Sequence, residues 1–146
     1  MAALLTAVVI AVVGPPGPLD DPSPGDQRPG ILTGPADARV VTAGLLPGQT
    51  VGQRRVLVVF DRATPDRERL RAFILRAGQR FTTRVVLPGP PGARLATAIG
   101  MARPRDGGPP IGFALIDASR RVRYATIDPT YLQHGDELET VAGAVP

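Results

Sequence analysis

A threonine lies between two carboxylates in the stretch FDRATPDRER, residues 60–69. The hydroxyl of Thr64 is of a type that can act as a nucleophile, and Asp61 and Asp66 flank it as acid–base groups. A threonine nucleophile also needs a neighbouring base and an oxyanion hole, and the single histidine, His134, is expected in a loop well away from Thr64. We therefore interpret Asp66 as an acidic residue of a first helical turn, favoured by the helix dipole, and we assign no catalytic residue.

The composition excludes several kinds of chemistry. The chain of 146 residues contains no cysteine, so disulfides, thiolate metal ligands and a thiol nucleophile are all excluded. His134 has no partner at metal-ligand spacing and is interpreted as a surface residue, and no glycine-rich phosphate loop follows a strand. We predict no metal, nucleotide or flavin cofactor.

Hydrophobic periodicity predicts an α/β domain from residue 56 onward. The apolar run VLVVF, residues 56–60, is typical of a central strand covered on both faces, and a helix should follow it, with Thr64 as its cap, Pro65 at its first position and Gly78 as its stop. We further expect a strand at 83–87, a turn at 88–92, a helix at 93–102, a hairpin of strands 111–116 and 122–127, a last helix opened by a capping box of Asp136 and Glu139, and an earlier strand around 39–42. The first two core strands should be parallel, because a helix connects them, and the hairpin should add antiparallel strands.

Two stretches resemble the redoxin domains of the thioredoxin superfamily, a group that includes peroxiredoxins and membrane-tethered thiol-disulfide oxidoreductases. The sequence VLVVFDRATPDRERLRAF resembles the family's strand and active-site helix, where a Cys-Pro-x-Cys or Thr-Pro-x-Cys turn follows an apolar run that ends in Phe. The sequence PPIGFALIDASRRVRYATID resembles the second half, in which a proline opens the third core strand. The resemblance covers residues 43–145 and implies a thioredoxin-like three-layer α/β/α sandwich with a central mixed sheet.

The turn that carries the family's cysteines is different in this chain. Thr64 and Arg67 occupy the two cysteine positions in one alignment, and Pro65 and Glu68 occupy them in an ungapped one. A guanidinium stays protonated and is no nucleophile, and thiol-disulfide exchange requires a thiolate. We therefore expect a redox-inactive domain. The alternative is an oxidoreductase or antioxidant protein of this family that uses unrecognised residues or a partner's thiols.

Pro110 is our candidate for the family's cis-proline, which faces the active-site turn and helps to bind an extended substrate segment. The resemblance therefore implies a peptide-binding groove framed by Thr64, Pro65, Asp66, Arg67 and Pro110. In this interpretation the chain is a protein-binding or scaffold module. Pro110 is otherwise explained as a rigid start to the strand that follows it.

The arginines suggest a further class of partner. All 17 basic residues are arginine, and the formal net charge is +4. Arg120, Arg121 and Arg123 cluster at the predicted hairpin, where they form a candidate site for anionic lipid or nucleic acid, while Arg54 and Arg55 precede the first core strand. Aromatic residues make up only 4% and no nucleic-acid motif is present, so solvated arginine faces are favoured over a nucleic-acid site.

The first 30 residues predict a tether. Residues 1–13, MAALLTAVVIAVV, are apolar and match a signal-peptide core in length, although they are too short for an ordinary membrane span. Residues 14–30 are rich in Pro, Gly and Asp and predict a disordered linker before a folded domain at 31–146. We expect membrane association through the N-terminus and an extracytoplasmic domain, with a secreted or cytoplasmic protein and a buried N-terminal helix as the alternatives.

Overall fold

The computed structural model describes residues 38–46, 54–101, 104 and 107–146. In chain order its elements are the 3-10 helix η1 (Ala43–Leu45), strand β1 (Arg55–Phe60), helix α2 (Arg67–Ala77), strand β2 (Phe81–Val86), helix α3 (Pro90–Ile99), strands β3 (Gly112–Ile116) and β4 (Val122–Ile127), the 3-10 helix η2 (Tyr131–Gln133) and helix α4 (Gly135–Ala144). The predicted apolar segment 1–13 and linker 14–30 lie outside the described residues. Each helix in the described ranges is too short or too polar to cross a bilayer.

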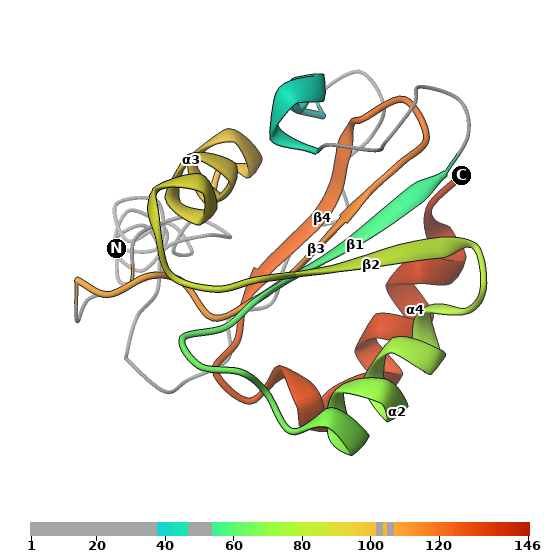
Figure 1. The fold of residues 1–146 in the computed structure, drawn as a ribbon. Helices are drawn as coiled ribbons and strands as arrows, with labels where there is room; N and C mark the ends of the chain where they lie inside the picture. The colour runs from blue at the N-terminus through green and yellow to red at the C-terminus, as the bar shows by residue number, and fades with distance from the viewer. Residues whose placement is uncertain (1–37, 47–53, 102–103, 105–106) are drawn as a thin grey trace, which may run out of the picture.

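The strands form one mixed sheet in the order β2-β1-β3-β4. Strand β1 pairs with β2 in parallel and with β3 in antiparallel fashion, and β3 and β4 form the predicted hairpin. The α/β class and the mixed sheet are therefore confirmed. This topology brings the C-terminal ends of β1, β2 and β4 together with the N-terminal end of β3 (Figure 1). We call this end of the strands the upstream edge of β3.

Helices cover both faces of the sheet, with α2 and α4 on one face and α3 on the other (Figure 1). The alternation of side chains along β1 explains why both faces need cover. Leu57 and Val59 pack in the core of α2 and α4, whereas Val56, Val58 and Phe60 pack in the core of α3. The continuous apolar run of β1 is thus the pattern of a central strand with two buried faces, as predicted.

Aromatic rings form the centre of the core beneath α2 and α4. The ring of Phe73 on α2 meets Phe113 of β3 and Tyr131 of η2 edge-on, with centroids 5.4 and 5.2 Å apart. All three side chains are at most 2% exposed. Phe73 therefore joins a helix, the sheet and the loop after β4 in one contact.

The start of α2 differs from the prediction. Asp66 is the N-cap, and its carboxylate accepts a hydrogen bond of 2.8 Å from the backbone N–H of Arg69. The predicted cap at Thr64 and first helical position at Pro65 are therefore wrong, and both residues belong to the preceding turn. The predicted stop is confirmed, because the chain leaves α2 at Gly78 with a positive φ of 77° that glycine adopts without strain.

Three other boundaries shift for identifiable reasons. The predicted turn at 88–92 is shorter, because Pro90 opens α3 and a proline needs no hydrogen-bond donor in the first helical turn. The predicted capping box at Asp136 and Glu139 does not form, because both residues lie inside α4 and their carboxylates bind Arg76 of α2 instead. The segment expected as a strand around 39–42 makes a single bridge, between Val40 and Arg121.

The ring contacts of Phe73 lead to a stability prediction. Phe73→Ala should lower the free energy of unfolding by about 3–5 kcal/mol, because it removes a buried ring and leaves a cavity. Leu75→Ala on the same helix is the control, since Leu75 is 70% exposed, and it should change stability by about 0.5 kcal/mol or less. Denaturant unfolding of the two variants measures the difference, and equal losses would contradict this packing.

Candidate functional site

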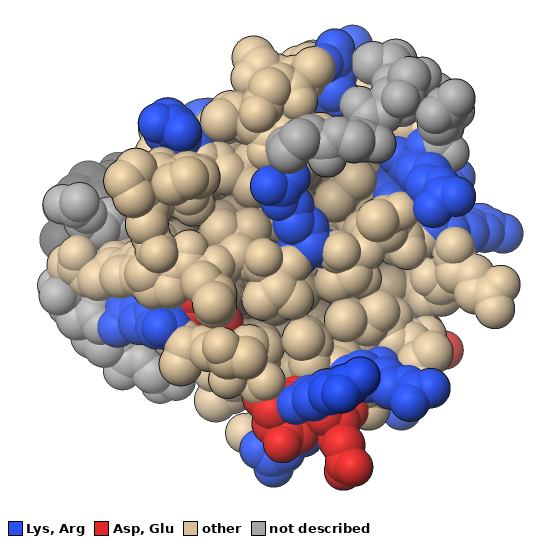
Figure 2. Space-filling model, viewed as in Figure 1, with Lys and Arg blue, Asp and Glu red and all other residues tan. Residues whose placement is uncertain are grey.

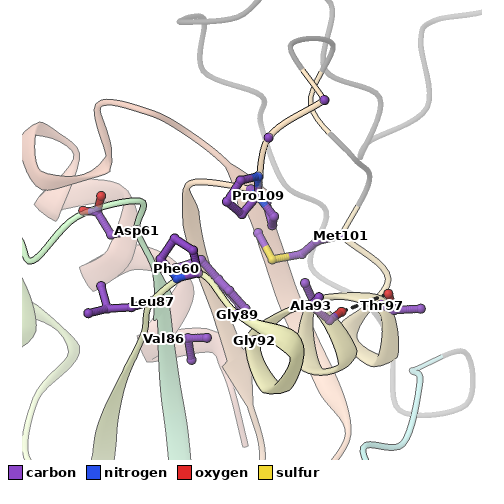
Figure 3. A pocket seen from close by; sticks show the side chains of 15 residues that line it. Phe60, Asp61, Val86, Leu87, Gly89, Gly92, Ala93, Thr97, Met101 and Pro109 are labelled. Atoms are coloured by element: carbon purple, nitrogen blue, oxygen red, sulfur yellow. Dashed lines mark hydrogen bonds between the residues drawn. The ribbon is translucent and has the colours of Figure 1, made fainter.

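A cavity of about 370 Å³ opens at the upstream edge of β3 (Figure 3). Its wall is formed by the end of β1, the loop from β2 into α3, one side of α3 and the segment 107–110. Apolar side chains dominate this wall, among them Phe60, Leu87, Met101 and Pro109. The arrangement is that of a small binding pocket whose main interaction is hydrophobic.

Arg62 ties the two sides of this cavity together. Its Nε donates a hydrogen bond of 2.8 Å to the carbonyl oxygen of Pro109, so the turn after β1 is held against the segment before β3. Pro110 lines the cavity beside Pro109. All described peptide bonds are trans, so the expected cis bond at Pro110 is not found. The proline nevertheless lies two residues before the third core strand, β3, close to the strand start that the sequence predicted.

The other predicted groove residues lie outside the cavity wall. Thr64, Asp66 and Arg67 are exposed, and Pro65 is half-buried. The structure therefore brings the turn after β1 to the segment of Pro110 through Arg62, a residue that the sequence interpretation did not single out. No part of the sequence pattern marks Arg62, because its role depends on a contact with a residue 47 positions away.

Asp61 stabilises the same turn from the opposite side. Its carboxylate accepts a hydrogen bond of 2.7 Å from the backbone N–H of Arg62 and one of 2.9 Å from the hydroxyl of Tyr131. The carboxylate is directed away from the cavity (Figure 3). Burial raises the pKa of Tyr131, and the hydrogen bond to Asp61 raises it further. Asp61, which is also among the residues that line the cavity, thus has a structural role in this turn.

A buried carboxylate organises the loop after β4. Asp128 is 0% exposed and accepts hydrogen bonds from the N–H and the hydroxyl of Thr130, both at 2.8 Å. Its second oxygen lies 2.6 Å from Nδ1 of His134. His134 is therefore a partner of a buried acid, although its side chain is still 34% exposed, and the sequence analysis predicted the surface position but not the contact with Asp128. The sequence signal that was missed is an aspartate followed two residues later by threonine, a spacing that favours a side-chain turn.

The Asp128–His134 pair fixes the orientation of the imidazole in the way that acid–base sites do. Neither residue lines the cavity, however, so the pair does not face a bound molecule there. We assign the pair a structural role, in which it fixes the start of α4, where His134 is the N-cap.

The predicted hairpin arginines do not form one exposed cluster. Arg123 is 7% exposed, and its guanidinium lies 3.6 Å from the carboxylate of Asp117, which is 7% exposed as well. Arg120 and Arg121 are half-buried, and Arg120 has a positive φ of 63° in the turn. Arg123 is therefore a residue of a buried ion pair, and the solvated strand face expected for it is wrong.

No group of three or more potential ligands that could hold a metal occurs in the ranges that the structure describes. Comparisons with protein-family models, with curated proteins and with solved structures gave no match.

The buried Tyr131 hydroxyl predicts a loss of stability at alkaline pH. In the folded chain the raised pKa keeps Tyr131 protonated, whereas in the unfolded chain it loses its proton near pH 10. The free energy of unfolding should therefore fall as the pH rises above about 10, because the folded state still holds the Tyr131 proton that the unfolded state has lost. Denaturant unfolding of Tyr131→Phe should show a shallower fall than the unmodified chain.

Tyr124→Phe is the matched control, because Tyr124 is the other of the chain's two tyrosines. It should keep the alkaline fall that Tyr131 causes. A fall that Tyr131→Phe leaves intact would disprove the hydrogen bond to Asp61 as its source.

Proposed function

We propose that this chain is a cysteine-less, redox-inactive thioredoxin-like domain that binds an extended protein segment at the upstream edge of β3. The strand order β2-β1-β3-β4, the antiparallel β3 and the helices on both faces support the proposal, because they agree with the architecture that the sequence resemblance implies. The apolar residues 1–13 and the linker 14–30 would tether this domain to a membrane.

The cavity beside Arg62 and Pro109 is the observation that carries the proposal. Its volume of about 370 Å³ is at the lower end of the range for ligand pockets and suits one large apolar side chain. The wall offers Phe60, Met101 and Pro109 as contacts for such a side chain. A single apolar anchor with a few polar neighbours is a common way for a domain to recognise a peptide.

The edge strand next to the cavity favours an extended peptide over a compact ligand. Among the described strands β2 pairs only with β1, so its other side presents backbone groups that a peptide can pair with. Leu87, which follows β2 and lines the cavity, is 45% exposed. A bound segment would place one side chain in the cavity and pair its backbone with the free side of β2.

The start of α2 explains why this binding mode needs no thiol. A helix N-terminus stabilises a negative charge, and in thiol enzymes that charge is a cysteine thiolate. Here the charge is the carboxylate of Asp66, which caps the helix through the N–H of Arg69. The N-terminus of α2 is therefore capped without a thiolate, and the proposed peptide binding at the neighbouring cavity requires no cysteine.

The peptide proposal predicts that filling the cavity abolishes binding. We would measure fluorescence anisotropy of labelled ten-residue peptides of Thr, Ser and Val with Phe, Leu, Ala or Asp at the centre. Peptides with Phe or Leu should bind more tightly than those with Ala or Asp. Ala93→Phe should weaken binding about tenfold or more, because Ala93 lines the cavity and the new ring occupies it.

Ala72→Phe is the matched control, since Ala72 and Ala93 are both exposed alanines on helices but only Ala93 lines the cavity. It should leave the affinity unchanged. Equal affinity for the Phe and Ala peptides, or equal effects of the two substitutions, would refute the cavity as the binding site.

Because the chain has no thiols, introducing a pair of cysteines at the start of α2 should create a disulfide-exchange activity. The unmodified chain should not reduce insulin disulfides, whereas Asp66→Cys with Arg69→Cys should form a reversible disulfide, because these positions are one helical turn apart. The first cysteine should have a thiol pKa below the usual value of about 8.5, since it replaces the helix cap. Thiolate absorbance against pH measures this effect.

Thr64→Cys with Arg67→Cys is the control pair, because Thr64 precedes the helix cap. The thiol at position 64 should have an ordinary pKa, and the pair should show weaker activity. Equal behaviour of the two pairs, or insulin reduction by the unmodified chain, would count against the proposed relation between this helix start and the redoxin turn.

A further inference from the structure

Strand β2 carries an arginine beside the apolar cavity. Side chains alternate between the two faces of a strand, so Thr82, Arg84 and Val86 share one face of β2. The register with β1 places Arg84 opposite Val58 and Val86 opposite Phe60. Both of these β1 residues pack in the core beneath α3. Arg84 therefore lies on the face of the sheet that α3 covers, which is the face on which the cavity opens.

The spacing of Arg84 from the cavity is that of a strand repeat. Val86 lines the cavity and Arg84, two residues earlier, does not. The distance between them along β2 is about 6.6 Å, at about 3.3 Å per residue. An extended segment paired with the free side of β2 has the same repeat. When one of its side chains enters the cavity, the side chain two residues away lies beside Arg84.

The charge of Arg84 has no counter-charge within the part of the chain that the structure describes. Its side chain makes no ion pair or hydrogen bond there, in contrast to those of Arg76 and Arg123. It is also half-buried, so solvent screens it less than a fully exposed arginine. Most of the acidic side chains visible in Figure 2 gather near α2, at the bottom of the view, and α2 covers the opposite face of the sheet.

The arginines where β1 and β2 begin differ from Arg84 in this respect. They line a second cavity of about 520 Å³, which we call the arginine-lined recess. Arg55 in its wall donates a hydrogen bond of 2.6 Å from Nε to the backbone oxygen of Pro146, and Arg54 has an interaction of its own. Charge complementarity therefore points to Arg84 and not to this recess.

From this arrangement we infer that the protein segment bound at the upstream edge of β3 carries an Asp or Glu two residues from its apolar anchor. The inference rests on the proposed function, in which the cavity holds the anchor. The carboxylate would accept charge-assisted hydrogen bonds from the planar donors of Arg84. Because β2 runs toward the cavity, the acidic residue follows the anchor in an antiparallel segment and precedes it in a parallel one.

A second copy of the chain does not meet this requirement. In a symmetric antiparallel pair through β2 that continues the sheet, the second copy would bring another Arg84 to the same face. Like charges on neighbouring strands destabilise such a pair. A segment of a different protein, with an acidic residue at the stated spacing, supplies the opposite charge.

Fluorescence anisotropy of labelled ten-residue peptides with the full chain tests the inference. The peptides consist of Thr, Ser and Val around a central Phe, and they carry Asp two residues after Phe, Asp two residues before it, or Asn at both positions. One of the two Asp peptides should bind about three- to tenfold more tightly than the Asn peptide, and which one binds shows the direction of the segment. The preference should shrink at 0.5 M NaCl.

Two substitutions assign the preference to one arginine. Arg84→Gln should abolish the preference for Asp and keep the affinity for the Asn peptide within twofold, because Arg84 does not line the cavity. Binding of the Asn peptide also shows that the variant is folded. Arg69→Gln is the matched control, because it removes an equal charge from an exposed arginine on α2, and it should keep the preference. Arg84→Glu should favour a peptide with Lys in place of Asp.

The outcomes separate this inference from the proposed function. Equal affinities for the Asp and Asn peptides, when the Phe peptide still binds more tightly than the Ala peptide, would overturn the inference alone. If no peptide bound, both would be overturned. Equal effects of Arg84→Gln and Arg69→Gln would also overturn the inference. So would sedimentation that showed paired copies of the chain which the Asp peptides did not separate.

Discussion

Strand β1 is buried on both faces, and the arrangement of the whole domain follows from that constraint. Its apolar side chains from Val56 to Phe60 point alternately toward α3 and toward the α2–α4 pair, so neither face of β1 is open to solvent. A bound molecule can then approach β1 at its two ends. Both cavities lie there, one where β1 ends and one where it begins.

Aspartates end three of the four strands and make each chain reversal specific. Asp61 follows β1, Asp117 follows β3 and Asp128 follows β4, and each carboxylate accepts a hydrogen bond from a backbone N–H one or two residues later. Each also has a distant partner: the Tyr131 hydroxyl for Asp61, Arg123 for Asp117 and His134 for Asp128. A local turn and a tertiary contact thus depend on the same side chain, so the loops at both edges of the sheet are held firmly.

The sequence predicted what local patterns determine. The strands at 56–60, 111–116 and 122–127 and the helix stop at Gly78 follow from hydrophobic runs and turn residues, and the structure has them within a residue or two. The start of α2 was misplaced because Thr64 and Asp66 are both good caps, and one carboxylate hydrogen bond to Arg69 decides between them.

The candidate sites could not be predicted in the same way, because each is made by distant segments. The sequence did not reveal that Arg123 is buried, because its partner Asp117 is brought to it only by the folded hairpin. Arg62 likewise contacts a carbonyl oxygen 47 residues away.

The hydrogen bond between Arg55 and Pro146 has a practical consequence. Any polypeptide fused after Pro146, such as an affinity tag, would leave the domain beside the arginine-lined recess. Immobilising the protein by that end would obstruct the recess while leaving the apolar cavity accessible.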